Sequence, residues 1–413
     1  MRACIHRGAR EVGGSCVEVE HEGWRILLDL GLPLTAGIDA ESRLPAVTGL
    51  AGGDASLLGI IVSHGHPDHW GLVPDAHKDV PVFIGEATQR ILREAAFFTP
   101  TGADLRANGF LRDRQPFSLG PFTITPFLTD HSAFDAYSIL IEADGRRLLY
   151  TGDVRAHGRK RGVFDRLVGE PPESINVLLL EGTHVGREQG EPSLSEEELQ
   201  PELARVFGAT EGLVLACYSP QNIDRLVTVF KAAKQSGRKL VLDLYAASVT
   251  RASGNPRIPQ AQWDDVLVYV PLSQRIRVKR SGEFERTAAI RRQRVFPEQL
   301  AAQASSFVMT FRGSMARELE RVGCLDRAHC VWSLWPGYLE NPSGERMRQW
   351  LTNRQIPLTV LHSSGHAMVE DLQRLAAAIS AERVTPIHTS APHLYESLFA
   401  NVELRADGEW WDV

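Results

Sequence analysis

The stretch SHGHPDHWG, residues 63–71, places four side chains of metal-binding types within six positions. The apolar run LLGIIV before it predicts a buried strand that ends at this stretch. Imidazole and carboxylate groups are the usual protein ligands of catalytic zinc. The pattern therefore favours a metal site over a solvated polar loop, and we expect Trp70 to pack beneath the loop. The four side chains are His64, His66, Asp68 and His69.

Residues of the same types recur at the ends of other predicted strands. His131 follows the strand FTITPFLTD, Asp153 follows a predicted hairpin, and Glu181 ends the strand INVLLL. His366 and His388 come much later, in SSGHA and VTPIHTS. Strand after strand thus delivers His, Asp or Glu at its C-terminal end.

Length and composition limit the classes of protein. A chain of 413 residues favours two domains, or one domain with an insertion. The net charge of −6 argues against coating of nucleic acid by charge alone. No apolar run is long enough to span a bilayer, and the N-terminus has no hydrophobic signal core. Five scattered cysteines favour reduced thiols, so we expect a cytoplasmic protein without membrane contact.

The order of predicted elements indicates a split domain. Residues 1–192 alternate short strands with polar joints, including a hairpin that turns at Asp144-Gly145. Residues 193–352 alternate strands and helices, which predicts a parallel α/β module. In SLSEEELQPELARVF, Ser is followed three residues later by Glu before an apolar periodic run, which predicts a helix that begins with a capping box. Residues 353–413 again deliver histidines at strand ends. The simplest architecture is one domain made of the first and last segments, with the middle segment inserted.

The His-x-His-x-Asp-His pattern resembles the signature of the metallo-β-lactamase superfamily. This resemblance implies an αββα sandwich that holds two divalent metal ions, with Zn²⁺ as the first candidate and Mn²⁺ as the alternative. It also implies that His64, His66 and His131 hold one ion. Asp68, His69 and His388 would hold the second, and Asp153 would bridge the two.

An α/β insertion before the last histidines resembles the β-CASP nucleases of this superfamily. Glu181 resembles the acidic motif of that group, His366 its second motif and His388 its third motif, in the histidine form of the RNA-acting members. DHSAFDAYSILIEADGRRLLYTGDVR resembles the bacterial ribonuclease J type. The chain is expected to lack the C-terminal domain of full-length ribonuclease J and a preceding KH-like segment. The segment after Glu181, THVGREQG, differs from the Ser-Thr-Tyr-Gly sequence that is more usual in this group.

Several polar residues of the insertion, and Ser364 shortly after it, are candidate contacts for substrate phosphate. SPQNIDRL, residues 219–226, resembles a ribonuclease J stretch at a strand-to-helix joint, where backbone N–H groups favour anions. Ser and Asn are also ordinary helix caps. The basic runs RIRVKR and RRQR could follow a nucleic-acid backbone or form a solvated face. The candidate phosphate contacts are Ser219, Asn222, Arg225, Arg312, Ser314 and Ser364.

Together these features predict a metal-dependent ribonuclease that hydrolyses phosphodiester bonds of single-stranded RNA with a two-metal-activated hydroxide. Two alternatives remain: a small-molecule metallohydrolase of the same fold, and a non-catalytic nucleic-acid-binding relative. The oligomeric state is open, with a homodimer as one option. The residues assigned to catalysis are Asp68, Asp153, Glu181, His366 and His388.

Overall fold

The structure is a computed structural model that describes residues 1–34, 44–187 and 194–413. None of the helices in these ranges combines the length and the apolar character needed to cross a bilayer. All five cysteines lie in the described ranges, and each is buried with a free thiol.

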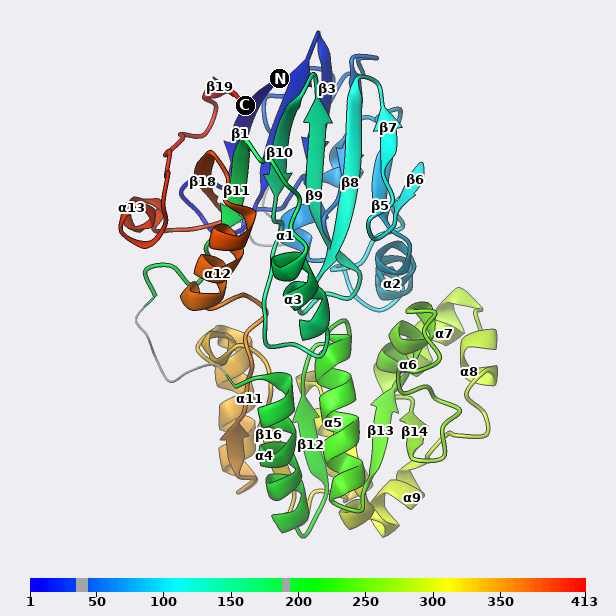
Figure 1. The fold of residues 1–413 in the computed structure, drawn as a ribbon. Coiled ribbons are helices and arrows are strands. Elements are labelled where there is room, and N and C mark those ends of the chain that lie inside the picture. The colour runs from blue at the N-terminus through cyan, green and yellow to red at the C-terminus, as the bar shows by residue number, and fades with distance from the viewer. Residues whose placement is uncertain (35–43, 188–193) are drawn as a thin grey trace. The chain divides into compact units, whose positions relative to one another are not determined.

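Within the described residues, the chain forms two compact units. Unit 1 comprises Met1–Pro192 and Gly365–Val413, and unit 2 comprises Ser193–Ser364. The first boundary expected from the sequence, between residues 192 and 193, lies outside the described residues. The second lies twelve residues later than the expected end at 352. Strand β17 (Leu358–Val360) explains this difference, because it pairs with β16 (His329–Trp332), which Figure 1 labels in unit 2.

The described strands of unit 1 form two sheets. The first sheet runs in the order β19 (Trp410–Asp412), β1 (Arg2–Arg7), β2 (Cys16–His21), β3 (Trp24–Leu28), β4 (Leu57–Ile61), β5 (Val82–Gly85) and β6 (Gly109–Leu111). The second runs in the order β18 (Arg383–Ile387), β11 (Val177–Glu181), β10 (Arg146–Tyr150), β9 (Ala136–Ala143), β8 (Phe122–Thr129) and β7 (Phe117–Leu119). Both sheets mix parallel and antiparallel pairs.

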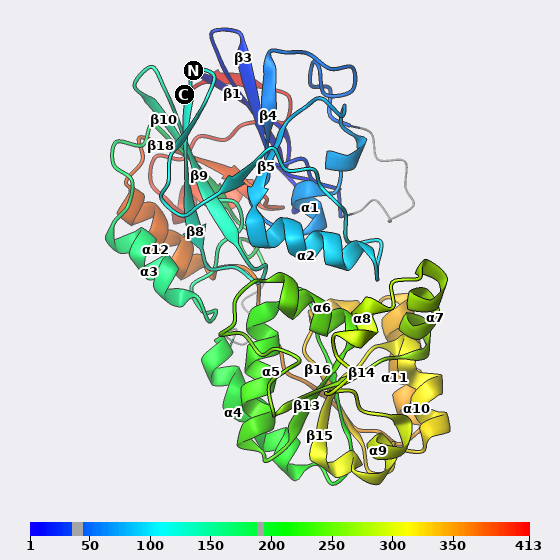
Figure 2. The ribbon, with the colours of Figure 1, turned by 90° about the vertical axis from the view of Figure 1, so that its right-hand side faces the viewer.

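Apolar side chains hold these sheets face to face with helices outside them. Val19 and Ile26 of the first sheet pack in one core with Ile139 and Leu148 of the second. Figure 2 shows the resulting layers of unit 1, with α3 and α12 on one side and α1 and α2 on the other. The predicted αββα sandwich is therefore confirmed. Its helices are α1 (Pro67–Trp70), α2 (Glu86–Ala96), α3 (Arg161–Gly169), α12 (Val369–Ile379) and α13 (Tyr395–Leu398).

Unit 2 is built on one described sheet whose neighbouring strands are all parallel. Its strand order is β14 (Val266–Tyr269), β13 (Lys239–Asp243), β15 (Phe307–Thr310), β12 (Val214–Cys217), β16 (His329–Trp332) and β17 (Leu358–Val360). Helices cover both faces, with α4 and α5 on one side and α10 and α11 on the other (Figure 2). The helices are α4 (Glu196–Ala209), α5 (Ile223–Gln235), α6 (Leu244–Ala252), α7 (Leu272–Ser281), α8 (Glu285–Ala288), α9 (Pro297–Ala302), α10 (Ala316–Val322) and α11 (Pro342–Asn353).

Local signals in the sequence correspond to the ends of these elements. The β9–β10 hairpin turns at Asp144 and Gly145, whose φ angles of 47° and 72° suit a type I′ turn. Helix α4 begins with the predicted capping box, in which Ser195 and Glu198 satisfy each other's backbone N–H groups. These predictions depend on neighbours in sequence, and both are confirmed.

Candidate metal centre

The histidine-rich loop joins β4 to α1 in unit 1. Trp70 packs beneath this loop in the core of the first sheet and is 3% exposed. Its indole N–H donates to the Gly65 carbonyl at 3.0 Å. The expected packing role of Trp70 is confirmed. The loop approaches the backbone closely at Gly31. A Cβ atom at this position would lie 1.7 Å from the Asp68 carbonyl oxygen, so a larger residue would clash.

Asp153 lies at the centre of the buried polar cluster. Its Oδ2 is 3.6 Å from His64 Nε2, 3.3 Å from His69 Nε2 and 3.8 Å from His131 Nε2. Its Oδ1 is 3.8 Å from His388 Nε2. This carboxylate therefore faces side chains that follow β4, β8 and β18, and Asp153 itself follows β10.

The potential ligand atoms form three groups that share this region. Within each group the atoms lie within 4.8 Å of one another. In the second group, Asp68 Oδ2 is 3.9 Å from His69 Nε2 and 3.8 Å from His388 Nε2. The first group is His64, His66, His131 and Asp153, the second is Asp68, His69 and His388, and the third is Asp153, His366 and His388.

Unpaired buried atoms show that this cluster fits a cation. Among the described residues, His69 Nε2, His388 Nε2 and Asp153 Oδ1 are buried without a hydrogen-bond partner. A buried polar atom without a partner costs free energy, and a coordinated ion would remove that cost. Imidazole nitrogen and carboxylate oxygen also match the ligand preference of zinc. The residues present therefore fit two divalent ions.

The electrostatics of most of the histidines agree with this fit. His69 is the exception, because burial opposes a charge on its ring but Asp153 and Asp29 outweigh that effect and raise the pKa of the ring. Burial lowers the pKa of His66 to about 4 and holds the pKa of His64 and His131 well below the usual value. These rings are consequently neutral near pH 7, which is the form that coordinates a metal. Burial would raise the pKa of Asp153, but His388 and His69 outweigh it and keep the carboxyl ionised.

Hydrogen bonds behind the cluster orient two candidate ligands. His69 Nδ1 is 2.7 Å from Asp29 Oδ2, and the same carboxylate accepts the Tyr150 hydroxyl at 2.8 Å. His388 Nδ1 is 2.9 Å from Ser15 Oγ. Such contacts fix the ring orientation and leave Nε2 for the ion. Sequence reasoning missed Asp29 and Ser15, although Asp29 directly follows the strand RILL and thereby gave a usable signal.

Glu181 and His366 lie beside the cluster. His366 Nδ1 is 3.4 Å from Glu181 Oε1 and 3.7 Å from Asp153 Oδ2, and the His366 side chain is 21% exposed. Glu181 is buried and accepts the backbone N–H groups of Val154 and Thr183. Burial opposes a charge on His366, but Glu181 and Asp153 outweigh it and raise the pKa of the ring.

The candidate phosphate contacts belong to unit 2, and most follow strand ends there. Ser219 follows β12, Arg312 and Ser314 follow β15, and Ser364 follows β17. Arg312 donates to Asp243 at 2.7 Å, with its side chain 28% exposed. Exposed Ser314 and partly exposed Ser219 and Ser364 keep accessible surface.

The assignment of Arg225 to phosphate is corrected by its surroundings. Its guanidinium is fully buried, pairs with Glu196 at 3.0 Å and donates to Ser333 and Ser363. These contacts occupy the group and leave it no accessible surface. Asn222 caps α5 by accepting the backbone N–H of Arg225 at 2.9 Å. Both residues thus have structural contacts that the sequence pattern did not distinguish from ligand contacts.

Comparisons with known proteins agree with the fold. Residues 25–205 match the model of the β-lactamase superfamily domain. The chain is 22% identical to ribonuclease J of Sinorhizobium meliloti, over 91% of this chain and 65% of that protein. It is 26% identical to ribonuclease J of Mycobacterium tuberculosis, over 58% of this chain and 44% of that protein. The chain thus spans less than two thirds of the length of either relative.

One solved structure has a similar fold along almost the whole chain. It is the crystal structure of a protein of unknown function from Enterococcus faecalis, with a TM-score of 0.80 and 20% identity over 99% of each chain. At this identity the likeness shows a common fold.

Proposed function

We propose that this chain hydrolyses phosphodiester bonds of single-stranded RNA. The matched domain and the relatives support a β-CASP, ribonuclease J-like family of metallo-β-lactamase-fold proteins, and the proposal starts from that premise. The observation that carries the proposal is the convergence of two ligand groups on Asp153, next to the Glu181–His366 pair. A ribonuclease needs charge neutralisation at phosphate and a group that serves the leaving oxygen, and this arrangement offers both.

The ligand groups assign the metal-holding residues. His64, His66 and His131 would hold one ion, Asp68, His69 and His388 the other, and Asp153 would contact both. When bound, two divalent cations, with zinc the first candidate and manganese the second, supply positive charge that favours ionised water and an anionic phosphate at neutral pH. Asp29 and Ser15 would hold His69 and His388 in orientation.

His366 is our candidate for proton delivery. Its raised pKa favours the imidazolium form, and Glu181 faces its Nδ1 at 3.4 Å. Two backbone N–H groups fix the Glu181 carboxylate, so this residue can orient the ring. A protonated His366 can then donate to the leaving oxygen of the cleaved strand or hold the scissile phosphate. The preference for RNA rests on the resemblance of His366 and His388 to the motifs of RNA-acting relatives.

The test compares matched 5′-phosphorylated RNA and DNA single strands, with metal content measured on the same protein. We expect RNA cleavage that a chelator abolishes and that zinc or manganese restores. His366→Gln should lower the rate by about 10²- to 10⁴-fold, because it removes a proton donor. That variant should retain the bound metal, and the control His77→Gln, outside the cluster, should retain both activity and metal.

Other results would reject the proposal. Hydrolysis of a thioester or lactam without RNA cleavage would assign a small-molecule metallohydrolase. RNA binding without cleavage by the metal-loaded protein would assign a non-catalytic relative. Equal cleavage of RNA and DNA would remove the claimed preference for RNA.

A further inference from the structure

Unit 2 carries a strongly basic segment, residues 275–294, in a chain that is otherwise acidic. The segment holds eight Lys and Arg against two Glu, a net charge of +6. The remaining residues hold 37 Lys and Arg against 49 Asp and Glu, a net charge of −12. Such a concentration of one sign attracts an oppositely charged partner over several ångströms.

Several charges of the basic segment face solvent without partners. Lys279 and Arg280 lie in the last turn of α7, and Arg291 and Arg292 follow α8. All four are exposed, and within the described ranges their side chains have no ion-pair or hydrogen-bond partner. Cations in a last helical turn also favour the helix dipole. That structural effect explains Lys279 and Arg280 but not Arg291 and Arg292, which lie outside α7.

Exposed aromatic rings accompany these charges. Phe284 is 60% exposed and Phe296 is 47% exposed. The Arg294 guanidinium carbon lies 4.8 Å from the centre of the Phe296 ring. Proteins that bind single strands combine cations that contact phosphates with aromatic faces on which bases stack. An acidic protein partner would not need the two rings at these positions.

The basic segment rests on a fixed support. Gln274 of α7 donates to Asp243 Oδ2 at 2.7 Å, and Arg312 donates to the same carboxylate. Glu318 accepts the Leu272 backbone N–H at 2.7 Å, which satisfies a free donor at the start of α7. Gly282, with φ of 78°, ends the helix in the left-handed conformation. Helix α7 therefore starts beside Arg312, at the carboxyl edge of the sheet.

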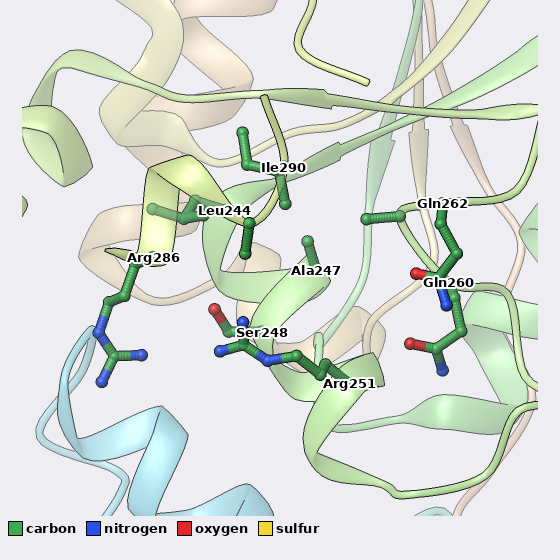
Figure 3. A pocket seen from close by; sticks show the side chains of 10 residues that line it. Leu244, Ala247, Ser248, Arg251, Gln260, Gln262, Arg286 and Ile290 are labelled. Atoms are coloured by element: carbon green, nitrogen blue, oxygen red, sulfur yellow. The ribbon is translucent and has the colours of Figure 1, made fainter. Parts of the chain in front are cut away.

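A small hollow borders the basic segment. It has a volume of about 50 Å³ and is lined by Arg286, Ala289 and Ile290 of the segment, by residues of α6 and by residues 260–262. Figure 3 shows Ser248 and Arg251 on α6, with the Arg251 side chain extending toward Ser248. This volume is far below the roughly 300 Å³ of a typical ligand pocket. The surface therefore suits an extended chain with repeated phosphates better than an enclosed small molecule.

We propose that the basic segment is a second contact surface for single-stranded RNA, which binds its sugar-phosphate backbone through Lys279, Arg280, Arg291 and Arg292. This inference rests on the proposed function. The surface consists of unit 2 residues alone and includes none of the candidate metal ligands. Its consequence is that RNA affinity depends on charges that the metal centre does not supply.

The test is a neutral variant in which Lys279, Arg280, Arg291 and Arg292 are all replaced by Gln. The matched control replaces four exposed, unpaired arginines of α10 and α11 in the same unit, Arg317, Arg321, Arg346 and Arg348, by Gln. Both variants change the net charge equally. Binding of labelled oligo(U) is measured in chelator across a salt series, and cleavage is measured in parallel with zinc or manganese. Circular dichroism and thermal unfolding check that both variants fold.

We expect the neutral variant to bind about 10- to 100-fold more weakly at low salt, because phosphate contacts release counterions. The slope of log affinity against log salt should shrink by about 3, which corresponds to roughly 0.7 for each lost contact. The control variant should lose little affinity and keep its slope.

The outcomes separate the two proposals. If the wild-type protein cleaves RNA but the neutral variant binds with unchanged affinity and slope, the surface assignment is wrong and the proposed function stands. If both variants lose affinity equally, general charge explains the binding and the assignment also fails. If the neutral variant changes only the oligomeric state, the surface is a protein interface. If wild-type protein neither binds nor cleaves RNA, both proposals fall.

Discussion

Two residues of the candidate metal centre adopt a backbone conformation that residues other than glycine rarely take. Asp29 has φ of 60° and His388 has φ of 53°. Such conformations cost of the order of 1 kcal/mol and concentrate at functional sites. In this conformation the Asp29 side chain contacts His69, and the His388 side chain contacts Ser15. At the scale of the residue, the strained backbone at Asp29 and at His388 accompanies the contacts that orient the imidazole rings of His69 and His388.

The Asp29 contact gives a prediction at this scale. Asp29→Asn keeps the size of the side chain but removes the charge that faces His69 Nδ1. We expect metal affinity to fall about 10- to 100-fold, because partners behind a ligand set its orientation and basicity. Competition with a chromogenic chelator measures this loss.

Tyr150→Phe is the matched control, because it removes a hydroxyl from the same carboxylate and leaves the charge in place. Its effect on metal affinity should be smaller. Unchanged affinity in Asp29→Asn would show that Asp29 only packs against His69.

At the scale of elements, strand ends position the site in unit 1, and one buried ion pair organises unit 2. The ends of β4, β8, β10, β11 and β18, together with the short helix α1 after β4, deliver the candidate ligands and Glu181. In unit 2, Arg225 of α5 joins Glu196 of α4 to the segments after β16 and β17, through Ser333 and Ser363. Arg225, which the sequence pattern suggested as a phosphate contact, thus links α5, α4 and the segments after β16 and β17.

This link predicts the effect of Arg225→Met. The substitution leaves the Glu196 carboxylate buried without its cation, so the free energy of unfolding of unit 2 should fall by about 3 to 5 kcal/mol. The double variant Arg225→Met/Glu196→Gln should recover part of that loss, because the buried charge is gone. Urea unfolding followed by circular dichroism measures both.

Exposed Arg317→Met serves as the control and should leave unfolding unchanged within about 0.5 kcal/mol. The structural role of Arg225 would be refuted by a variant that keeps its stability but loses RNA affinity. That result would restore the phosphate contact expected from the sequence.

At the scale of the whole molecule, all candidate ligands belong to unit 1 and come from both of its segments, before and after unit 2 in the chain. His366 and His388 lie in the last segment, and the other members of the ligand groups lie in the first. A metal that contacts both segments stabilises their association, because it binds the folded arrangement and not the separated chain. Metal binding should therefore affect the two units unequally.

Hydrogen exchange can measure this difference. Chelation should increase exchange in β4, in α1 and at the end of β18, while β12 and β13 of unit 2 keep their protection. At metal concentrations 100-fold above the dissociation constant, the lost stabilisation is about 2.7 kcal/mol. An equal increase in both units, or no increase near the histidines, would contradict a metal centre confined to unit 1.

The sequence by itself determined the αββα fold with its inserted α/β module, the capped start of α4 and the identity of the strand-end histidines. These features depend on local periodicity, on turn residues and on motif resemblance, which the linear pattern contains. The ligand and catalytic roles of those residues remain predictions that the geometry supports.

Only the tertiary structure decided which polar groups already have partners. Asp29 meets His69 across forty positions of sequence, and Arg225 meets Glu196 across twenty-nine, so no local pattern marks either pair. Pairing of β17 with β16 likewise moved the domain boundary past residue 352. Burial and hydrogen-bond partnership arise when distant segments pack together. For that reason a phosphate contact and a buried structural arginine look alike in the sequence and differ in the fold.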